Sequence, residues 1–375
     1  MKKIILTLPV KNESDIIESY CRYNLTYSDG LVIYERGSID NTKEIIKKLI
    51  AEGLPIYLYD DPDIVFSDVN IANEMAKRAV DKYNADLVIY LEADEFICHI
   101  DGINPRETLE CMCENVEYIT PWRTYVYGQE PDITRGFMPN NFKCYRNPVL
   151  EYHKHKKAMI SRFLLKTKQA EFTVGAHKLV FPPKHEGSVR VEIPSKLVYA
   201  HFPLRSKAQF MAKSITKRIY HNFILMSSGK GWGSQYRLVW DDLKEKGDAS
   251  PDLIAEHAIK YGLPDWFWER KILEIGENRT VEGTLDSSFC ADKLELRYTY
   301  YEEANRTFLR TILAEMDNAA ASLAKNGMSS ELREQNESLT QQITDIYNSN
   351  TWKTGKKIQK VFRMFFPNRK KNNHI

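Results

Sequence analysis

The sequence predicts an α/β protein built on a doubly wound, mixed sheet and followed by a helical C-terminal extension. Over the first hundred residues, apolar segments of strand length alternate with amphipathic segments of helix length, and the connections are short. Alternation of this kind produces parallel strands with helices packed on the sheet. Acidic side chains follow the ends of several of these strands, at the edge where such sheets bind ligands.

Local signals define the elements of this first part. Strands are expected at residues 3–10, 30–35, 54–60 and 86–91, with helices at 12–25, 40–53 and 67–83 between them. Ser14 is the expected N-cap of the first helix, Asp40 or Asn41 caps the second, and Gly53 ends it. In the third helix a spacing of four places three apolar residues on one face: Ile71, Met75 and Ala79.

Beyond residue 100 the alternation gives way to strands and loops, and from about Ser206 the chain is predicted to be helical. One helix has a complete set of end signals, with Ser250 as its cap, Pro251 in its first turn and Gly262 after its end. A longer helix is expected over residues 302–325, where apolar residues recur at helical spacing.

These patterns divide the chain into three parts. Residues 1–215 are expected to form the α/β domain, residues 216–326 the helical extension, and residues 327–375 a short coiled-coil-like segment with a basic tail. With 43% hydrophobic and 28% charged residues, the composition is typical of a globular protein. No segment approaches the roughly 20 consecutive apolar residues that a membrane-spanning helix needs.

The net charge of +2 is unevenly distributed. Residues 353–375 contain eight Lys or Arg and no Asp or Glu, and subtracting these eight charges leaves −6 on residues 1–352. A basic tail on a mildly acidic body favours an anionic partner for the tail and argues against nucleic acid as a partner of the body. The six cysteines lack zinc-ligand spacing and are expected to be reduced thiols, as in a cytoplasmic protein.

Two phosphate-binding motifs are missing. The chain has no G-x-x-x-x-G-K-[ST] loop, and its first strand–helix connection, "LPVKNESD", contains no glycine. Both a P-loop and a dinucleotide site of the Rossmann type are therefore excluded. A ligand with a diphosphate would need another device, and a divalent cation held by carboxylates is the obvious one.

The segment "DLVIYLEADEF" ends a strand on three acids, Glu92, Asp94 and Glu95. Clustered carboxylates are costly unless they are solvated, protonated or neutralised by a cation. The pattern is compatible either with a solvated strand end or with a metal site at the sheet edge. Other acids follow the earlier strands on the same edge, at Glu13, Glu35 and Asp60.

Four segments in register resemble a known family. "LPVKNESDIIESY", "VIYERGSIDNTKEII", "LVIYLEADEF" and "HFPLRSKAQFMAK" resemble the nucleotide-sugar half of bacterial family 2-type glycosyltransferases with the GT-A fold. In the closest subgroup the acidic motif reads D-A-D-E-F, and the resemblance covers roughly residues 1–215. It implies a nucleotide-diphospho-sugar transferase that moves a sugar to a glycan or lipid-linked acceptor in cell-surface polysaccharide synthesis.

The resemblance also implies roles for donor-binding residues. Pro9 and Glu13 match the loop under the nucleoside, and Glu35 matches a position that contacts the base. Asp94 matches the acid that binds Mn²⁺ or Mg²⁺ directly. Glu92 replaces the usual first Asp of the motif, so its contact with ribose or with metal-bound water is shifted by one methylene.

Further positions carry over from the downstream segments. His201 matches a histidine that completes the metal or diphosphate site, and His177, in a Gly-x-His match, is a second candidate ligand. Arg205 and Lys213 are expected to neutralise the departing diphosphate.

The implied reaction is a single, inverting displacement in which a carboxylate takes the proton of the acceptor hydroxyl. Asp132 and Glu171 are candidates for this general base, and the sequence does not choose between them. His153 and His155 are expected to mark a basic loop. Helix capping explains the presence of Glu13 and Asp40 as well as a role in the site does. A purely structural role is expected more for Asp40 than for Glu13.

The last segment contains two amphipathic patterns. Residues 332–346 form a short heptad seam, compatible with a homodimer or with packing on the chain's own body. Ile358, Val361, Phe362 and Phe365 share one face of a basic helix, which indicates peripheral binding at the inner face of the cell membrane. Alternatives from other classes are a non-catalytic nucleotide- or sugar-binding module and a nucleotidyltransferase, although the glycine-rich loop of the latter is missing.

Overall fold

The computed structural model describes most of the chain up to residue 286. The described residues are 1–38, 40–60, 68–100, 102–128, 136–151, 156–211, 213–214, 242, 245 and 249–286. The chain divides into two compact units, residues 1–214 with 235–305 and residues 215–234 with 306–375. All described residues belong to the first unit. Asp132, His153, His155, the helix at 302–325 and the whole tail lie outside the described residues.

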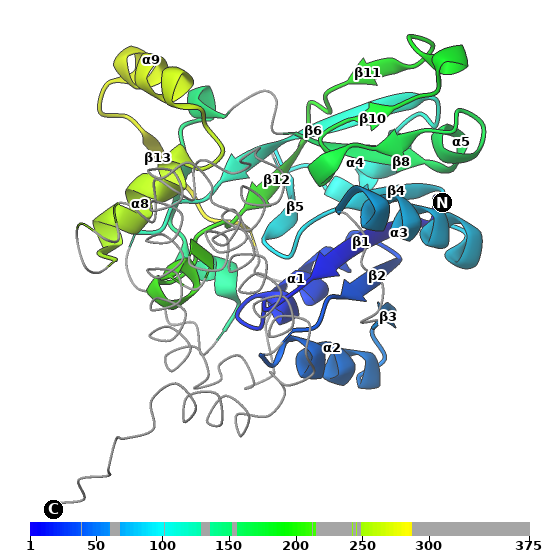
Figure 1. The fold of residues 1–375 in the computed structure, drawn as a ribbon, viewed down its shortest axis with the longest axis horizontal. Coiled ribbons are helices and arrows are strands. Elements are labelled where there is room, and N and C mark those ends of the chain that lie inside the picture. The colour runs from blue at the N-terminus through cyan, green and yellow to red at the C-terminus, as the bar shows by residue number, and fades with distance from the viewer. Residues whose placement is uncertain are drawn as a thin grey trace, which may run out of the picture. The chain divides into compact units, whose positions relative to one another are not determined.

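The first unit is a mixed α/β structure, as predicted. The N-terminal strands and helices alternate: β1 (Ile4–Val10), α1 (Ile17–Asn24), β2 (Gly30–Glu35), α2 (Thr42–Ala51), β3 (Ile56–Tyr59), α3 (Asp68–Tyr83) and β4 (Leu87–Tyr90). Strands β1, β2, β3 and β4 pair in parallel, and the first three lie side by side with α2 nearby (Figure 1). The doubly wound parallel part is therefore confirmed.

The rest of the sheet is contributed by later strands of mixed direction. These elements are β5 (Glu95–His99), α4 (Pro105–Cys111), β6 (Val116–Thr124), β7 (Cys144–Arg146), β8 (Lys156–Ser161), α5 (Arg162–Lys166), β9 (Glu171–Phe172), β10 (Leu179–Val180), β11 (Arg190–Glu192) and β12 (Leu197–His201). Among the described residues the main sheet has the order β3-β2-β1-β4-β8-β6-β12-β5, and β11 pairs with β6 as a ninth strand. Strand β8 is antiparallel to β4 and β6, and β12 is antiparallel to β5.

Short elements from the predicted helical extension belong to the same unit. They are α8 (Pro251–Lys260), α9 (Asp265–Ile275) and β13 (Thr280–Glu282), which pairs with β7. The predicted cap of α8 is confirmed, because the Ser250 side chain accepts a hydrogen bond from the Leu253 N–H. The predicted boundary at residue 215 stays a prediction.

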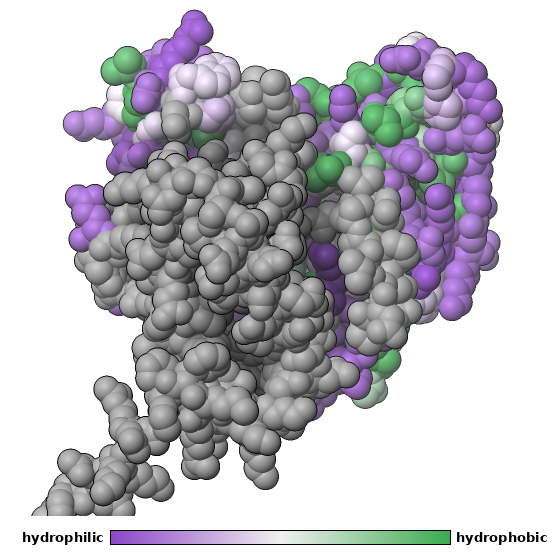
Figure 2. Space-filling view, viewed as in Figure 1, coloured by the Kyte–Doolittle hydropathy of each residue, from purple (hydrophilic) through white to green (hydrophobic). Residues whose placement is uncertain are grey.

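One part of the core lies between the sheet and α3. Ile71, Met75 and Ala79, the predicted inner face of this helix, are buried against residues of β1, β2 and β4. On the face drawn in Figure 2, hydrophilic side chains cover most of the described surface and hydrophobic ones lie in small separate patches. In the part of the chain that the structure describes, no helix is long and apolar enough to cross a membrane.

The predicted cap of the first helix is wrong. Helix α1 begins at Ile17, and the Ser14 side chain does not cap it. Asp40 instead accepts hydrogen bonds from the Ser14 N–H (3.0 Å) and the Thr42 N–H (2.9 Å), while the Glu13 N–H bonds Thr42 Oγ1. These bonds hold the loop after β1 against the start of α2, while the Ile16 and Ile17 N–H groups donate to the Glu13 carbonyl, where a Ser14 cap was expected. Asp40 therefore has a structural role, as expected, because its side chain joins the loop after β1 to the start of α2.

Candidate functional site

A buried cluster of charges lies at the carboxyl edge of the sheet, where the acidic motif follows β4. Asp94 is 4% exposed, and its Oδ2 lies 3.2 Å from Lys213 Nζ, 3.8 Å from Arg205 Nη1 and 3.9 Å from His201 Nε2. Lys213 also donates to the Pro203 carbonyl. Residues more than 100 positions apart therefore meet at a single carboxylate.

Arg205 connects this cluster to the loop after β1. Its side chain is fully buried, and it donates from Nε and Nη2 to the two Asp15 oxygens (2.7 and 2.9 Å), from Nη2 to Glu13 and from Nη1 to the Phe202 carbonyl. Such a bidentate contact is specific to a planar guanidinium. Arg205 therefore links the loop after β1 to the segment that follows β12. Sequence reasoning missed Asp15, which looked like part of a helix N-terminus.

The charge states follow from burial and from these neighbours. Burial alone would raise the pKa of Asp94, but Lys213, His201 and Arg205 outweigh it and hold that pKa well below its usual range. Burial raises the pKa of Glu13 to about 7, with Arg205 and Lys213 opposing. The neighbours of Asp94 therefore favour its carboxylate form, whereas burial shifts Glu13 towards its neutral form.

His201 ends β12 inside a set of aromatic rings. Its ring stacks on Trp122 (centroids 4.3 Å apart) and meets Tyr261 edge-on at 5.3 Å. Tyr261 follows α8, and the buried Arg146 side chain donates to the carbonyls of Ile259 and Tyr261 there. A residue from beyond position 250 thus lies against the predicted site, which local sequence signals did not indicate.

The donor atoms fit a divalent cation that is completed by a substrate. Asp94 Oδ1 and His201 Nδ1 are buried and have no hydrogen-bond partner among the described residues. Those residues contain no group of three or more His, Cys, Asp or Glu that could hold a metal ion. Mg²⁺ in nucleotide sites is held by one or two carboxylates plus substrate phosphates. Asp94, with His201 beside it, would hold the ion in that manner.

Comparison with protein-family models gives no match, and comparison with curated proteins gives none either. Solved structures do align. A mannosyltransferase from Pyrobaculum calidifontis in complex with GDP-Man and Mn²⁺ aligns over 98% of this chain and 88% of that chain, at 13% identity and a TM-score of 0.35. GDP-Man and Mn²⁺ are ligands of the mannosyltransferase in that complex, and they are not assigned to the present chain here.

Glucosyl-3-phosphoglycerate synthase from Mycobacterium tuberculosis also aligns. Its complex with Mn²⁺, UDP and glucosyl-3-phosphoglycerate matches over 53% of this chain and 72% of that chain, with 18% identity and a TM-score of 0.29. Its complex with Mn²⁺, UDP and phosphoglyceric acid matches over 32% and 44%, with 19% identity and a TM-score of 0.24. The chemistry of the present chain is therefore read from its own side chains.

Other predicted residues lie around the cluster in different settings. Pro9 is part of β1 and pairs with Tyr34, and Glu35 is buried at the end of β2, where it accepts the Ser38 N–H. The Glu92 side chain is half exposed (49%), with its Oε1 3.8 Å from Lys157 Nζ. Its longer arm therefore extends toward a buried lysine and solvent.

His177 is held by an unusual turn. Gly175 and Ala176 both have positive φ (68° and 54°), and a Cβ at Gly175 would lie 2.6 Å from His177 Nε2. The Gly-x-His pattern therefore has a steric reason, because a side chain at position 175 would collide with the ring. His177 Nδ1 lies 2.9 Å from the Lys156 carbonyl, and its ring meets Trp122 edge-on at 6.0 Å. Strands β8 and β6 thus fix the place of this histidine.

Glu171 is the candidate base that the described structure contains. Its side chain is 54% exposed on β9 and pairs with Lys77 of α3 at 3.8 Å. Within the described ranges it forms no ion pair with Lys213 or His201. The structure thus brings Glu13, Asp94, His201, Arg205 and Lys213 together and leaves Glu171 on the outer surface.

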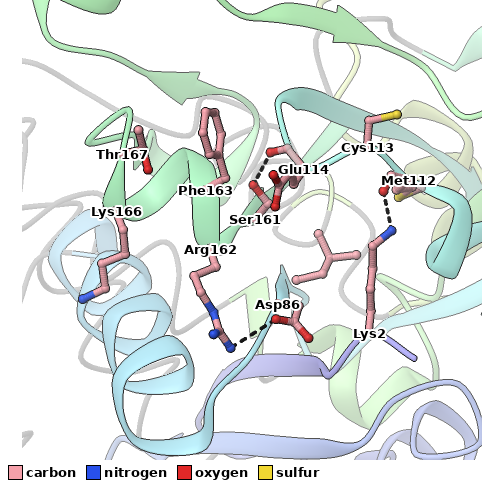
Figure 3. Close-up of a pocket in the computed structure, with 11 residues that line it drawn as sticks. Lys2, Asp86, Met112, Cys113, Glu114, Ser161, Arg162, Phe163, Lys166 and Thr167 are labelled. Carbon is pink, nitrogen blue, oxygen red and sulfur yellow. Dashed lines mark hydrogen bonds and ion pairs between the residues drawn. The ribbon is translucent and has the colours of Figure 1, made fainter.

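A cavity of about 400 Å³ lies elsewhere, at the opposite end of β4 (Figure 3). Four of its charged lining residues are already paired: Arg162 with Asp86 (3.1 Å), Lys166 with Asp81, and Lys2 with backbone carbonyls around Met112. Asp86 precedes β4, whereas Asp94 follows it. This cavity is therefore separate from the charge cluster.

The His201 environment predicts a pH effect. Burial lowers the pKa of His201 to about 3, with Asp94 opposing and Lys213, Lys157 and Arg146 reinforcing it. Since an unfolded histidine titrates near 6.5, its stabilising contribution is complete above that pH and is lost as the pH falls towards 3. We expect His201 to reduce the free energy of unfolding by at most about 1.4 kcal/mol per pH unit below 6.

Urea unfolding of the metal-free protein and of His201→Phe at pH 7, 6 and 5 measures this slope. The variant should show a smaller loss on acidification than the parent protein. A His201 imidazole that titrates near pH 6.5 in an NMR experiment would contradict the expectation.

Proposed function

We propose that this protein is a metal-dependent glycosyltransferase of the GT-A type, related to the bacterial family 2-type enzymes with a D-A-D-E-F motif. The Asp94 cluster at the carboxyl edge of the sheet carries the proposal. It combines His201, a partly exposed cation, Lys213, and a carboxylate oxygen that has no hydrogen-bond partner among the described residues. The four motifs in register support it independently. The donor is a nucleotide sugar and the acceptor is a glycan or a lipid-linked glycan.

In the proposed mechanism this chain supplies positions and charges for one displacement at the anomeric carbon. Asp94 would hold a divalent cation, which would supply Lewis-acid stabilisation of the leaving diphosphate. The Lys213 ammonium, whose side chain is 18% exposed, leaves Asp94 and pairs with a phosphate oxygen. Arg205 holds Glu13 in the loop under the nucleoside, since its own N–H groups are engaged there.

A carboxylate takes the proton from the acceptor hydroxyl as the hydroxyl oxygen attacks, with inversion at the anomeric carbon. Asp132 is our preferred base, because Glu171 lies exposed beside Lys77. His177 remains a candidate second ligand. Its fixed ring near Trp122 supports a place close to the donor.

Thermal unfolding with nucleotide sugars tests this function. In the presence of Mn²⁺, the correct donor at 100 times its dissociation constant should add about 2.7 kcal/mol to the free energy of unfolding. A panel of UDP-, GDP- and dTDP-sugars with and without Mn²⁺ will measure the shift in Tm. No metal-dependent shift with any donor would argue against the function.

A non-catalytic nucleotide- or sugar-binding module is the second candidate. It is favoured by the ion pair between Asp94 and Lys213, which neutralises the carboxylate without a metal. Such a module would show the thermal shift but neither transfer nor release of nucleotide from the donor. Measurement of nucleotide diphosphate release separates the two functions.

We also propose that the protein acts in the cytoplasm at the inner face of the membrane, through its basic tail. Each Lys or Arg near an anionic leaflet contributes about 1 kcal/mol, and apolar side chains of residues 358–365 would add to it on entering the membrane interface. Deletion of residues 353–375 should abolish sedimentation with anionic vesicles while a small acceptor is still glycosylated. Full-length protein that ignores these vesicles at low salt would contradict the proposal.

A further inference from the structure

Glu95, the third acid of the motif, is completely buried and faces the protein. Its Oε1 accepts a hydrogen bond from Trp122 Nε1 (2.8 Å), and its Oε2 accepts one from the Glu92 N–H (2.7 Å). Lys157 Nζ lies 3.3 Å from the same Oε2. Glu95 therefore uses both oxygens within the fold and is not placed to meet a substrate.

Lys157 is buried as well, and a lysine ammonium is rarely buried unless it has a partner. Its side chain is 1% exposed, with Nζ 5.3 Å from the Tyr90 ring centre and 5.9 Å from that of Trp122. Burial works against both charges and raises the pKa of Glu95 to about 8, with Lys157 opposing, but Glu92 and Glu95 outweigh burial for Lys157 and raise the pKa of its ammonium. A buried ion pair of this kind costs desolvation and adds little to stability, so stability alone does not account for it.

The sheet register places this pair beside His201. Glu95 lies directly opposite His201 in the β5–β12 pairing, Trp122 lies opposite Tyr199 in the β6–β12 pairing, and Lys157 lies opposite Thr120 in the β6–β8 pairing. Since side chains alternate along a strand, these registers put Lys157, Trp122, His201 and Glu95 on one face of four neighbouring strands. They form a row that ends at the Asp94 cluster.

We propose that Glu95 and Lys157 are positioning residues that hold the Trp122 ring, and through it the His201 ring, in the orientation that presents Nε2 to Asp94. The Trp122 N–H is fixed by Glu95 Oε1, the indole face stacks on His201 at 4.3 Å and 26°, and His201 Nε2 then faces Asp94 Oδ2 at 3.9 Å. Lys157 fixes the carboxylate at its other oxygen. The consequence for metal binding rests on the function proposed above, whereas the orientation of His201 does not.

The best variant is Glu95→Gln combined with Lys157→Met, which removes both buried charges together. A glutamine accepts at one oxygen, so it cannot serve the Trp122 N–H and the Glu92 N–H at the same time. Trp122→Phe is the second variant, since it keeps an aromatic face and removes the N–H donor. Trp268→Phe on α9 is the matched control, because its indole lies beside Lys260 and Arg279 instead of beside His201.

Two readouts are needed, and neither requires a donor sugar. The first is the NMR spectrum of ¹⁵N-labelled histidine side chains in the metal-free protein, and the second is Mn²⁺ binding measured by paramagnetic broadening of the His201 signal. Both variants should shift the His201 signals and weaken Mn²⁺ binding by about 10- to 100-fold, the usual cost of losing support behind a ligand. The control should change neither.

Shifted His201 signals in folded variants support the proposal, and unchanged signals in both overturn it, whatever the sugar-transfer assays return. If the double variant does not fold, Trp122→Phe decides by the same criterion. Wild-type protein that binds no Mn²⁺ would count against the proposed function, and the metal-free spectra would still decide the positioning role.

Discussion

Replacement of Asp94 by Asn should reduce sugar transfer by about 10²- to 10³-fold, the effect of removing one preorganised group that stabilises developing charge. The amide is nearly isosteric with the carboxylate, but it lacks the negative charge that would hold the cation beside the leaving diphosphate. Sugar transfer and Mn²⁺ binding, measured on the purified variant, test this expectation.

The fold should survive this substitution. Lys213 is partly exposed and can turn to water, Arg205 keeps Asp15 and Glu13, and the bond from the Phe202 N–H to the Asp94 carbonyl is unaffected. Asp86→Asn is a matched control, since Asp86 lies at the other end of β4, half exposed beside Arg162. Metal-dependent turnover at the wild-type rate in Asp94→Asn would show that Asp94 does not hold the cation.

Replacement of Arg205 by Met should have the largest effect on stability. It leaves the buried Asp15 carboxylate and the partly exposed Glu13 carboxylate without their guanidinium partner, and breaking a buried pair such as Arg205–Asp15 costs about 3–5 kcal/mol. For a unit of this size we expect Tm to fall by roughly 10 °C. Urea or thermal unfolding followed by circular dichroism measures the change.

Two further variants sharpen this test. Arg205→Lys should recover part of the stability lost in Arg205→Met, because it keeps a positive charge beside Asp15. The recovery should be incomplete, because one ammonium cannot bond both oxygens of Asp15 and also reach Glu13. Arg270→Met removes a pair whose side chains are both more than 40% exposed, and it should cost less than about 1 kcal/mol. A free energy of unfolding for Arg205→Met within about 1 kcal/mol of wild type would mean that the loop after β1 is held by other contacts.

Much of the fold was predictable because its signals are local. Strand β2 has the predicted bounds, and β1, β3, β4 and the three helices between them lie within the predicted ranges. Their parallel pairing follows from strand–helix alternation, which permits few other arrangements. The start of α1 was missed because the Ile16 and Ile17 N–H groups, which a Ser14 cap would bond, donate to the Glu13 carbonyl instead.

The candidate site was predictable in part for a different reason. Asp94, His201, Arg205 and Lys213 were found from four short motifs, and the structure places the last three side chains within 4 Å of one Asp94 oxygen. Glu171 was proposed from its residue type alone, and the structure shows it paired with Lys77 on the surface. A residue type that suits a general base did not by itself predict a position near the Asp94 cluster.

By itself, the sequence determined the α/β class, the parallel order of the first strands and the edge where the acids gather, because these depend on periodicity and on strand ends. Only the tertiary structure decided which groups surround each acid of the motif. Glu95, Asp94 and Glu92 are almost adjacent in the chain, yet Lys157, Lys213 and solvent are their respective neighbours. The two lysines lie far along the chain from these acids, and only the register of β5, β6, β8 and β12 and the segment that follows β12 bring them to their places.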